Sequence, residues 1–303
     1  MVAIDNRHSR INAVGNPAKM MIGKTPPNIT ACSPLQNGVV ADFDIASALL
    51  EYFLRKEAGS VIFSRPKVFM AVPHCASSTE KRSFYEIAAK AGAKNIGLVP
   101  ETLAAAIGIG LKIEEPRGKM IVNIGGGTTE ASVISFGGAV LTNSIRVGGT
   151  HFDKAISAYM RRRFGILIGD VTAEMLKKNI GSVFPTGDEG SMEVHGSQNG
   201  MPVTVNVSGA EMSEVLRAQA AQIVECIRAA FERTPPELCS DIGESGIIIT
   251  GGTSAMRGMD RLIEKKTGIR TVCAKRPLDS VVNGLAQIIE HGDKFGIVEK
   301  TDR

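Results

Sequence analysis

The sequence predicts a mixed α/β protein of two domains, and three observations support this fold class. Short apolar runs with strand character alternate with amphipathic helical segments along most of the chain. A β-rich segment followed by α/β alternation occurs in both halves, which indicates a coarse duplication. The length of 303 residues suits about two domains, and no exact short repeat indicates a solenoid.

The first half opens with apolar runs at 2–4 and 11–14, and repeated Gly and Pro residues up to position 40 predict strands and turns. Ser77 and Glu80 have the spacing of a capping box, which predicts the start of a helix. Periodicity then predicts the remaining elements of this half, which are helices at 42–56, 78–91 and 101–110 and strands at 67–72 and 96–99. The helix at 101–110 is rich in small residues and is expected to pack closely against a neighbour.

The second half begins with strands on both sides of three glycines, at 120–124 and 131–134. The Gly- and Ser-rich stretch 181–200 is expected to form loops, and Asn199-Gly200 predicts a hairpin turn. Ser208 and Glu211 predict a second capping box. The other expected elements are helices at 152–164, 171–180 with Thr172 as its cap, 209–232, 255–266 and 279–289, strands at 202–207, 246–250 and 271–274, and a polar, frayed tail from His291.

Composition and charge exclude several classes of protein. The 35 basic and 31 acidic residues are nearly balanced, so a nucleic-acid partner is not expected. Five scattered cysteines without CxxC spacing indicate free thiols in a reducing compartment. No signal peptide and no run near the ~18 apolar residues of a membrane span are present, so a cytoplasmic location is expected.

The glycine-rich stretch at Gly125, Gly126 and Gly127 is the first candidate for a ligand site. Glycines allow backbone amides to converge on an anion, and the hydroxyls of Thr128 and Thr129 can donate to phosphate oxygens. A second candidate is the buried strand that runs into Gly251, Gly252, Thr253 and Ser254, because a following helix N-terminus attracts anions. Each motif alone is equally consistent with a glycine-rich turn that binds nothing.

Five segments, taken together and in order, resemble the MreB family of bacterial actin-like cell-shape proteins. The segments are LVPETLAAAIGIGL, NIGGGTTEASVIS, IRVGGTHFD, FERTPPEL and IIITGGTSAMRGMDRL. This resemblance covers nearly the whole chain and implies the duplicated ATPase fold of the actin and Hsp70 superfamily. It implies a first domain of residues 1–115 completed by the C-terminal helix 278–303, and a second domain of residues 116–277 with about 151–210 as its smaller subdomain.

The resemblance implies roles for individual residues. Glu101 matches the catalytic glutamate that orients the attacking water, and Thr128 matches a threonine that helps to hold that water. Gly125 to Thr129 match the second phosphate loop, Gly251 to Ser254 the adenosine-side loop, and Glu174 with Lys177 the ribose and adenine contacts. The implied cofactors are ATP and Mg²⁺, and no residue is assigned as a direct metal ligand.

Simpler interpretations of the same residues remain open. Glu101 can serve only as a favourable charge at a helix start. Glu174 and Lys177 lie three apart and can form a surface ion pair. The apolar stretch Val61 to Phe63 beside Arg65 can begin a buried strand, or it can dip into a membrane surface.

Two departures from the family pattern are present. The family opens with a strand–turn–strand carrying an aspartate and the first phosphate loop, and this chain is expected to lack it, so that domain I is N-terminally truncated. The strand at 67–72 would then lack a neighbour on one side and expose an apolar edge. Asn123 stands where the family has an aspartate, and Thr150 stands where it has an acidic residue; both changes remove negative charge and are expected to weaken Mg²⁺ binding and slow hydrolysis.

These features predict an ATP-binding, membrane-associated filament protein that organises cell-wall synthesis at the inner face of the cell membrane. Its expected partners are other copies of itself or an intact MreB, the membrane surface and the wall-synthesis machinery. The alternatives are a degenerate pseudo-ATPase paralogue, a truncated product, and a sugar kinase or chaperone ATPase. The last class is disfavoured because the chain has no room for a peptide-binding domain.

Overall fold

The computed structural model describes residues 1–8, 10–58, 66–184, 187, 189–292, 294 and 296–300. The chain forms two compact units, Met1–Pro100 with Gly296–Arg303, and Glu101–Phe295. Contacts thus divide the chain after Pro100 and Phe295, whereas the resemblance places the domain boundaries at 115 and 277. The latter boundaries stay a prediction.

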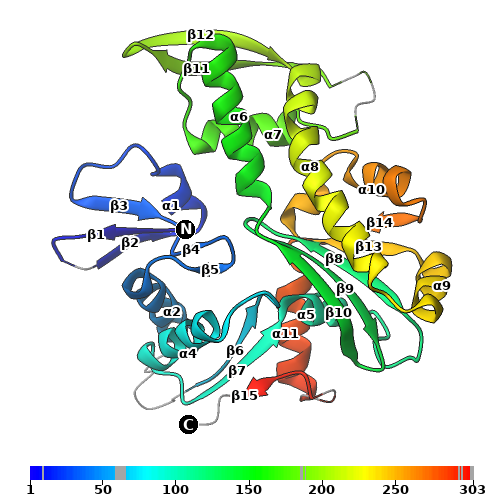
Figure 1. Ribbon diagram of the computed structural model, residues 1–303. Helices are drawn as coiled ribbons and strands as arrows, with labels where there is room; N and C mark the ends of the chain where they lie inside the picture. Colours follow the sequence, from blue (N-terminus) through cyan, green and yellow to red (C-terminus); the bar gives the residue numbers. More distant parts are fainter. Residues whose placement is uncertain are drawn as a thin grey trace. The chain divides into compact units, whose positions relative to one another are not determined.

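The first unit opens with a three-stranded antiparallel sheet in the order β2-β1-β3 (Figure 1). Its strands are β1 (Val2–Asp5), β2 (Arg10–Val14) and β3 (Ile29–Cys32). Four short or helical elements accompany it, α1 (Asn16–Met20), β4 (Leu35–Gln36), β5 (Val39–Val40) and α2 (Phe43–Ala58).

A second small sheet of this unit has the order β15-β7-β6. Strand β6 (Lys67–Val72) pairs in parallel with β7 (Asn95–Pro100), and β15 (Glu299–Lys300) returns antiparallel to β7. Helix α4 (Ser78–Lys90) joins β6 to β7 and buries Phe84 and Ala88 in the local core. Within the described residues β6 pairs with β7 alone.

The second unit is built on a five-stranded sheet in the order β10-β9-β8-β13-β14. An antiparallel meander joins β8 (Lys119–Ile124), β9 (Thr129–Ser135) and β10 (Gly138–Ile145). Strands β13 (Ile247–Thr250) and β14 (Thr271–Cys273) then add in parallel to β8. Because β8 and β13 are parallel, their carboxyl ends meet, with Asn123 opposite Thr250.

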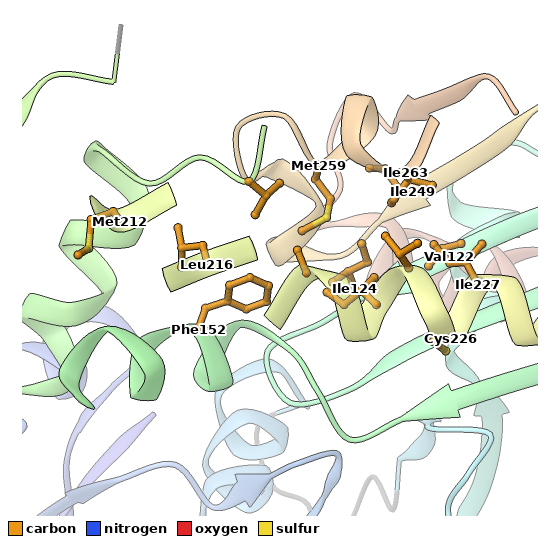
Figure 2. Packing of buried hydrophobic residues seen from close by; sticks show 14 of the residues in the cluster. Val122, Ile124, Phe152, Met212, Leu216, Cys226, Ile227, Ile249, Met259 and Ile263 are labelled. Carbon is orange, nitrogen blue, oxygen red and sulfur yellow. The ribbon is translucent and has the colours of Figure 1, made fainter. Parts of the chain in front are cut away.

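Helices cover both faces of this sheet. The long helix α8 (Gly209–Glu232) packs on one face, where Val122, Ile124 and Ile249 point into a core with Phe152, Met212, Leu216 and Ile227 (Figure 2). Helices α5 (Glu101–Gly108) and α11 (Ser280–His291) pack together, and α5 contacts β8 and β9 on the opposite face. The sheet therefore forms the middle layer of the second unit.

The segment between β10 and α8 shares the same core. It contains α6 (Gly149–Phe164), α7 (Asp170–Asn179) and the hairpin β11 (Ser191–Gln198) with β12 (Met201–Ser208). The remaining elements are α9 (Pro236–Ser245), the 3₁₀ turn η1 (Gly252–Ala255) and α10 (Met259–Thr267).

The structure confirms most expected elements and corrects some. Both capping boxes are present, with Ser77 and Ser208 each accepting from the amide three residues on. Residues 181–200 are not all loop, because β11 lies there. The helix expected from 255 starts at Met259 after a 3₁₀ turn, α7 is capped by Gly169 instead of Thr172, and the tail returns as β15. The expected membrane loop Val61 to Phe63 lies outside the described residues.

In the part of the chain that the structure describes, no helix combines the length and the apolar character that crossing a bilayer requires.

Candidate functional site

The glycine turn after β8 forms the base of the candidate site. The amide of Gly125 donates to the carbonyl of Thr128 at 2.8 Å and closes the turn between β8 and β9. Gly126 is exposed, and a Cβ added to it would meet no atom within 4 Å. Within the described residues, the amides of Gly126 and Gly127 donate to no backbone carbonyl. This turn therefore presents amide donors at an open surface.

A second glycine turn meets the first one. The amide of Gly149 donates to the carbonyl of Gly125 at 3.0 Å, and the amide of Thr150 donates to that of Gly126 at 2.8 Å. A Cβ at Gly148 would lie 2.6 Å from the Gly125 carbonyl oxygen, so only glycine fits this approach. Because Gly148 and Gly149 open the 16-residue helix α6, the N-terminus of that helix is fastened to the first turn.

The loop after β13 supplies the third part of the site. Gly251 has a φ of 85°, and a Cβ there would lie 2.4 Å from the carbonyl oxygen of Ile124. The hydroxyl of Thr253 donates to the carbonyl of Gly125 at 2.8 Å. Ser254 instead donates to the carbonyl of Gly251 at 2.7 Å and stabilises its own turn. Parallel pairing of β8 and β13 thus joins residues that are 128 positions apart.

Glu101 and Asn123 lie at the edge of this assembly. Asn123 is buried near the end of β8, and its Nδ2 donates to Oε2 of Glu101 at 2.9 Å. Burial raises the pKa of Glu101 to about 7; the neighbouring charge of Glu130 adds to this rise, and the Asn123 hydrogen bond opposes it. A carboxyl with a pKa near neutral can both release and accept a proton, which suits general acid–base chemistry.

Two threonines of the first turn have different surroundings. Thr128 is buried, with 4% of its surface exposed. The hydroxyl of Thr129 donates to the carbonyl of Val147 at 2.8 Å, which ties β9 to the segment that leads into α6. This hydrogen bond therefore connects the strand after the first glycine turn with the segment before the second one.

The polar residues of α7 have partners other than those expected from a surface ion pair. Lys177 Nζ lies 2.7 Å from Oδ1 of Asp153 on α6 and donates to the carbonyl of Gly149 at 2.9 Å. Glu174 pairs with Lys178 at 2.7 Å. In the structure Lys177 therefore pairs with Asp153 of α6, and Glu174 pairs with Lys178. Lys177 lies at the glycine turns, and Glu174 lies one helical turn before Lys178.

The structure brings most of the predicted site residues together in the second unit. Three glycine segments, Thr253 and Lys177 meet around the carbonyl oxygens of Gly125 and Gly149, and Glu101 joins them through Asn123. The sequence analysis included Gly148 and Gly149 only within the segment IRVGGTHFD and assigned them no contact, and it did not select Asp153 or Glu130. A Gly-Gly pair directly before a long helix was the signal that could have identified the second turn.

This arrangement can bind an anion. Open amides, glycines that admit close approach and the N-terminus of α6 are donors suited to phosphate groups. No group of three or more His, Cys, Asp or Glu side chains with metal-site geometry occurs in the described part of the chain. A separate shallow hollow of about 270 Å³, lined by charged residues such as Glu115, Arg117 and Asp241, shares no residue with this site.

Comparison with protein families and characterised relatives gives a consistent result. The family model described as MreB/Mbl protein matches residues 1–296. The chain is 42% identical over 289 residues to the cell shape-determining protein MreB of Escherichia coli (strain K12), covering 94% of this chain and 83% of that protein. It is 38% identical over 297 residues to the cell shape-determining protein Mbl of Bacillus subtilis (strain 168), covering 97% and 89% respectively.

Solved structures with a similar fold include nucleotide complexes and a filament. MreB5 of Spiroplasma citri bound to ADP superposes with a TM-score of 0.89 at 33% identity, covering 96% of this chain and 88% of that one. Its AMPPNP complex matches equally well, with a TM-score of 0.89 at 34% identity and the same coverage. The MamK double helical filament matches with a TM-score of 0.74 at 21% identity, covering 92% and 85%, which shows a common fold.

Proposed function

The chain belongs to the MreB/Mbl family and has an actin-like fold, and from this premise we propose that it binds ATP and assembles into filaments that help to determine cell shape. The relatives named above are cell shape-determining proteins, and a solved relative binds ADP and AMPPNP. In this role the filaments would lie at the inner face of the cell membrane and organise cell-wall synthesis. Head-to-tail contacts between copies generate such open filaments.

The meeting of three glycine turns at Thr253 is the observation that supports ATP binding most directly. The approach of Gly148 to Gly125 and of Gly251 to Ile124 leaves no space for a Cβ, whereas Gly126 faces open space. Amides of Gly126 and Gly127 with the hydroxyl of Thr128 would bind the terminal phosphates. The segment 251–254 would line the adenosine side, and Glu174 and Lys177 of α7 would contact the ribose and adenine.

The residues around Glu101 support slow hydrolysis. Bound Mg²⁺-ATP supplies the phosphoanhydride bond that water attacks. Glu101 would orient that water and accept its proton, and Thr128 would help to hold the water in place. Asn123 fills a position where an aspartate would add negative charge near the hydrated metal, so we propose weakened Mg²⁺ binding in this chain.

Calorimetric titration of the full chain with ATP tests the nucleotide site. Gly126→Val places a branched side chain in the open cradle, and Gly126 is outside the left-handed region, so the backbone accepts the change. We expect ATP affinity to fall about tenfold or more. Gly138→Ala is the control. A Cβ added at Gly138 also meets nothing within 4 Å, but Gly138 lies in β10 and not in the glycine turn. Equal affinities for the wild type and Gly126→Val would contradict the proposed cradle.

Sedimentation tests the two assembly properties separately. Filaments of the wild-type chain should pellet with ATP, and Gly126→Val should stay in the supernatant at the same concentration. Liposome co-sedimentation of Phe63→Asp tests the membrane loop, since an acidic residue there should lower binding to lipid. Unchanged lipid binding of this variant would remove the 61–63 stretch from the proposal.

A further inference from the structure

The face of the sheet beneath the first turn of α5 carries a row of polar side chains. Asn123 on β8 lies directly across the ladder from Glu130 on β9. Two residues further along β9, the hydroxyl of Ser132 donates to Oγ1 of Thr102 on α5 at 2.8 Å. Side chains two apart on a strand share one face, so Glu130 also faces the start of α5, where Glu101 receives its hydrogen bond from Asn123.

Glu130 is a carboxylate in the interior of the second unit. Glu130 has 0% of its surface exposed, and its Oε1 accepts a hydrogen bond from the hydroxyl of Ser144 on β10 at 3.1 Å. The alternate residues of β9, Ala131 and Val133, point to the apolar core on the other face. Burying an ionisable group costs free energy that a neutral side chain would not cost, so the position of Glu130 requires a physical reason.

The described residues around this pair include groups from α8, from α11 and from the segment after β10. From α8 the thiol of Cys226 lies nearby, and its pKa is raised to about 11, mainly by burial, with a contribution from the charge of Glu130. Arg146 follows directly after β10. The buried residues of helix α11 are uncharged; they are Ser280, Gly284 and Ile288. Burial and then the charge of Glu130 are the two causes that raise the pKa of Glu101.

We propose that Glu130 is a positioning residue for Glu101, and that the two carboxylates, beside the Asn123 amide that donates to Glu101, jointly hold one proton. Glu130 keeps the proton on or near Glu101 at neutral pH. Glu101 then exchanges this proton with water at the mouth of the glycine turns. The pair belongs to the chain itself, and only its consequence for hydrolysis rests on the proposed ATPase function.

Titration of the glutamate side chains in the nucleotide-free full chain tests the pair. Carboxyl carbons are labelled for NMR, and Glu101→Gln identifies the Glu101 signal by its loss. In Glu130→Gln the titration midpoint of the Glu101 carboxyl should fall by about one pH unit, because a neighbouring negative charge is removed. Glu130→Asp keeps the charge and should largely restore the midpoint. An unchanged midpoint in Glu130→Gln would overturn the proposal.

A second variant covers the case in which Glu130→Gln does not fold. Ser144→Ala removes the hydroxyl that donates to Glu130, so the shared proton should move toward Glu130 and Glu101 should titrate at a lower pH. Glu290→Gln on the exposed side of α11 is the control and should change neither midpoint. A Glu101 midpoint that Ser144→Ala leaves unchanged would also count against the pair.

ATP calorimetry on the same samples separates the two proposals. If the wild type fails to bind ATP while the Glu101 midpoint shifts in Glu130→Gln, the carboxylate pair stands and the nucleotide site fails. If ATP binds and the midpoint does not move, the carboxylate pair fails alone.

Discussion

At the scale of single residues, Asn123 shows how one change of charge alters a site without altering its shape. The amide keeps the size of an aspartate but donates a hydrogen bond to Glu101 at 2.9 Å, which a carboxylate cannot do. An aspartate at this place would face Glu101 and Glu130 and put three carboxylates in one interior cluster. The asparagine is therefore compatible with a stable chain in the absence of a cation.

Asn123→Asp tests this account. We expect the variant to be less stable than the wild type by about 1–3 kcal/mol at pH 8, because a donor is lost and like charges are brought together. At pH 6 protons neutralise part of the cluster, so the difference should shrink. Denaturant unfolding at both pH values measures it, with the exposed Asn206→Asp on β12 as the control. A difference that is equal at both pH values would contradict the electrostatic cause.

Glu101→Gln tests the pH dependence of folding. The folded chain raises the pKa of Glu101 from its ordinary 4.5 to about 7, so the folded state holds this proton more tightly than the unfolded state. This contribution is fully present below pH 4.5 and is lost as the pH rises through about 7. Between pH 5 and 8 the stability of Glu101→Gln relative to the wild type should therefore increase, by roughly 2 kcal/mol for this half-buried group. A constant difference across that range would show that Glu101 is not perturbed.

At the scale of elements, the contact between α5 and α11 depends on small residues. A Cβ at Gly108 would lie 1.9 Å from the carbonyl oxygen of Ser280, and one at Gly284 would lie 1.8 Å from that of Ala104. Both clashes are with backbone atoms, which cannot rotate away. The small-residue helix predicted at 101–110 therefore packs closely against a neighbour, as expected, and this packing holds Glu101 at the start of α5.

Gly284→Ala should separate the two helices. We expect a loss of about 2–3 kcal/mol in the free energy of unfolding, since an added methyl forces a backbone shift. Gly243→Ala in α9 is the matched control, because its Cβ meets nothing within 4 Å and the change should be neutral or stabilising by about 0.5–1 kcal/mol. If both variants unfold at the same denaturant concentration, the close contact does not determine stability.

At the scale of the whole molecule, the chain leaves the first unit after Pro100 and returns to it at Gly296. Strand β15 then pairs with β7, and Lys81 on α4 forms an ion pair with Glu299 at 2.8 Å. A Cβ at Gly97 would lie 2.5 Å from a methyl of Val298, so the returning segment packs tightly on β7. The C-terminal segment therefore belongs to the sheet formed by the first hundred residues.

Removal of residues 296–300 with all that follows should destabilise the first unit selectively. Loss of β15 leaves one edge of β7 without its partner, so amide hydrogen exchange should rise in β6 and β7 and stay unchanged in β8 and β13. Glu299→Gln removes the ion pair but keeps the strand. Because an exposed pair contributes only about 0–1 kcal/mol, amide hydrogen exchange in this variant should hardly change. Equal protection of β7 with and without the segment would contradict this role.

The accuracy of the sequence-based predictions follows the strength of local patterns. Capping boxes at Ser77 and Ser208 and the Asn199-Gly200 turn depend on neighbouring residues, and all three are present. Strand β11 has a mostly polar sequence, SMEVHGSQ, with one buried residue, so periodicity could not identify it. Its structure comes from a full antiparallel ladder with β12, which is a partner further along the chain.

The sequence by itself determined which segments can form turns for an anion, because glycine conformations and helix starts depend on adjacent residues. Only the tertiary structure decided which of them meet. Parallel pairing of β8 with β13 brings Thr253 to Gly125, and packing of α6 on α7 gives Lys177 the partner Asp153. The burial of Glu130 beneath Glu101 follows from strand register, in which a shift by one residue would turn it to the other face. Such contacts depend on distant residues, and no local pattern specifies them.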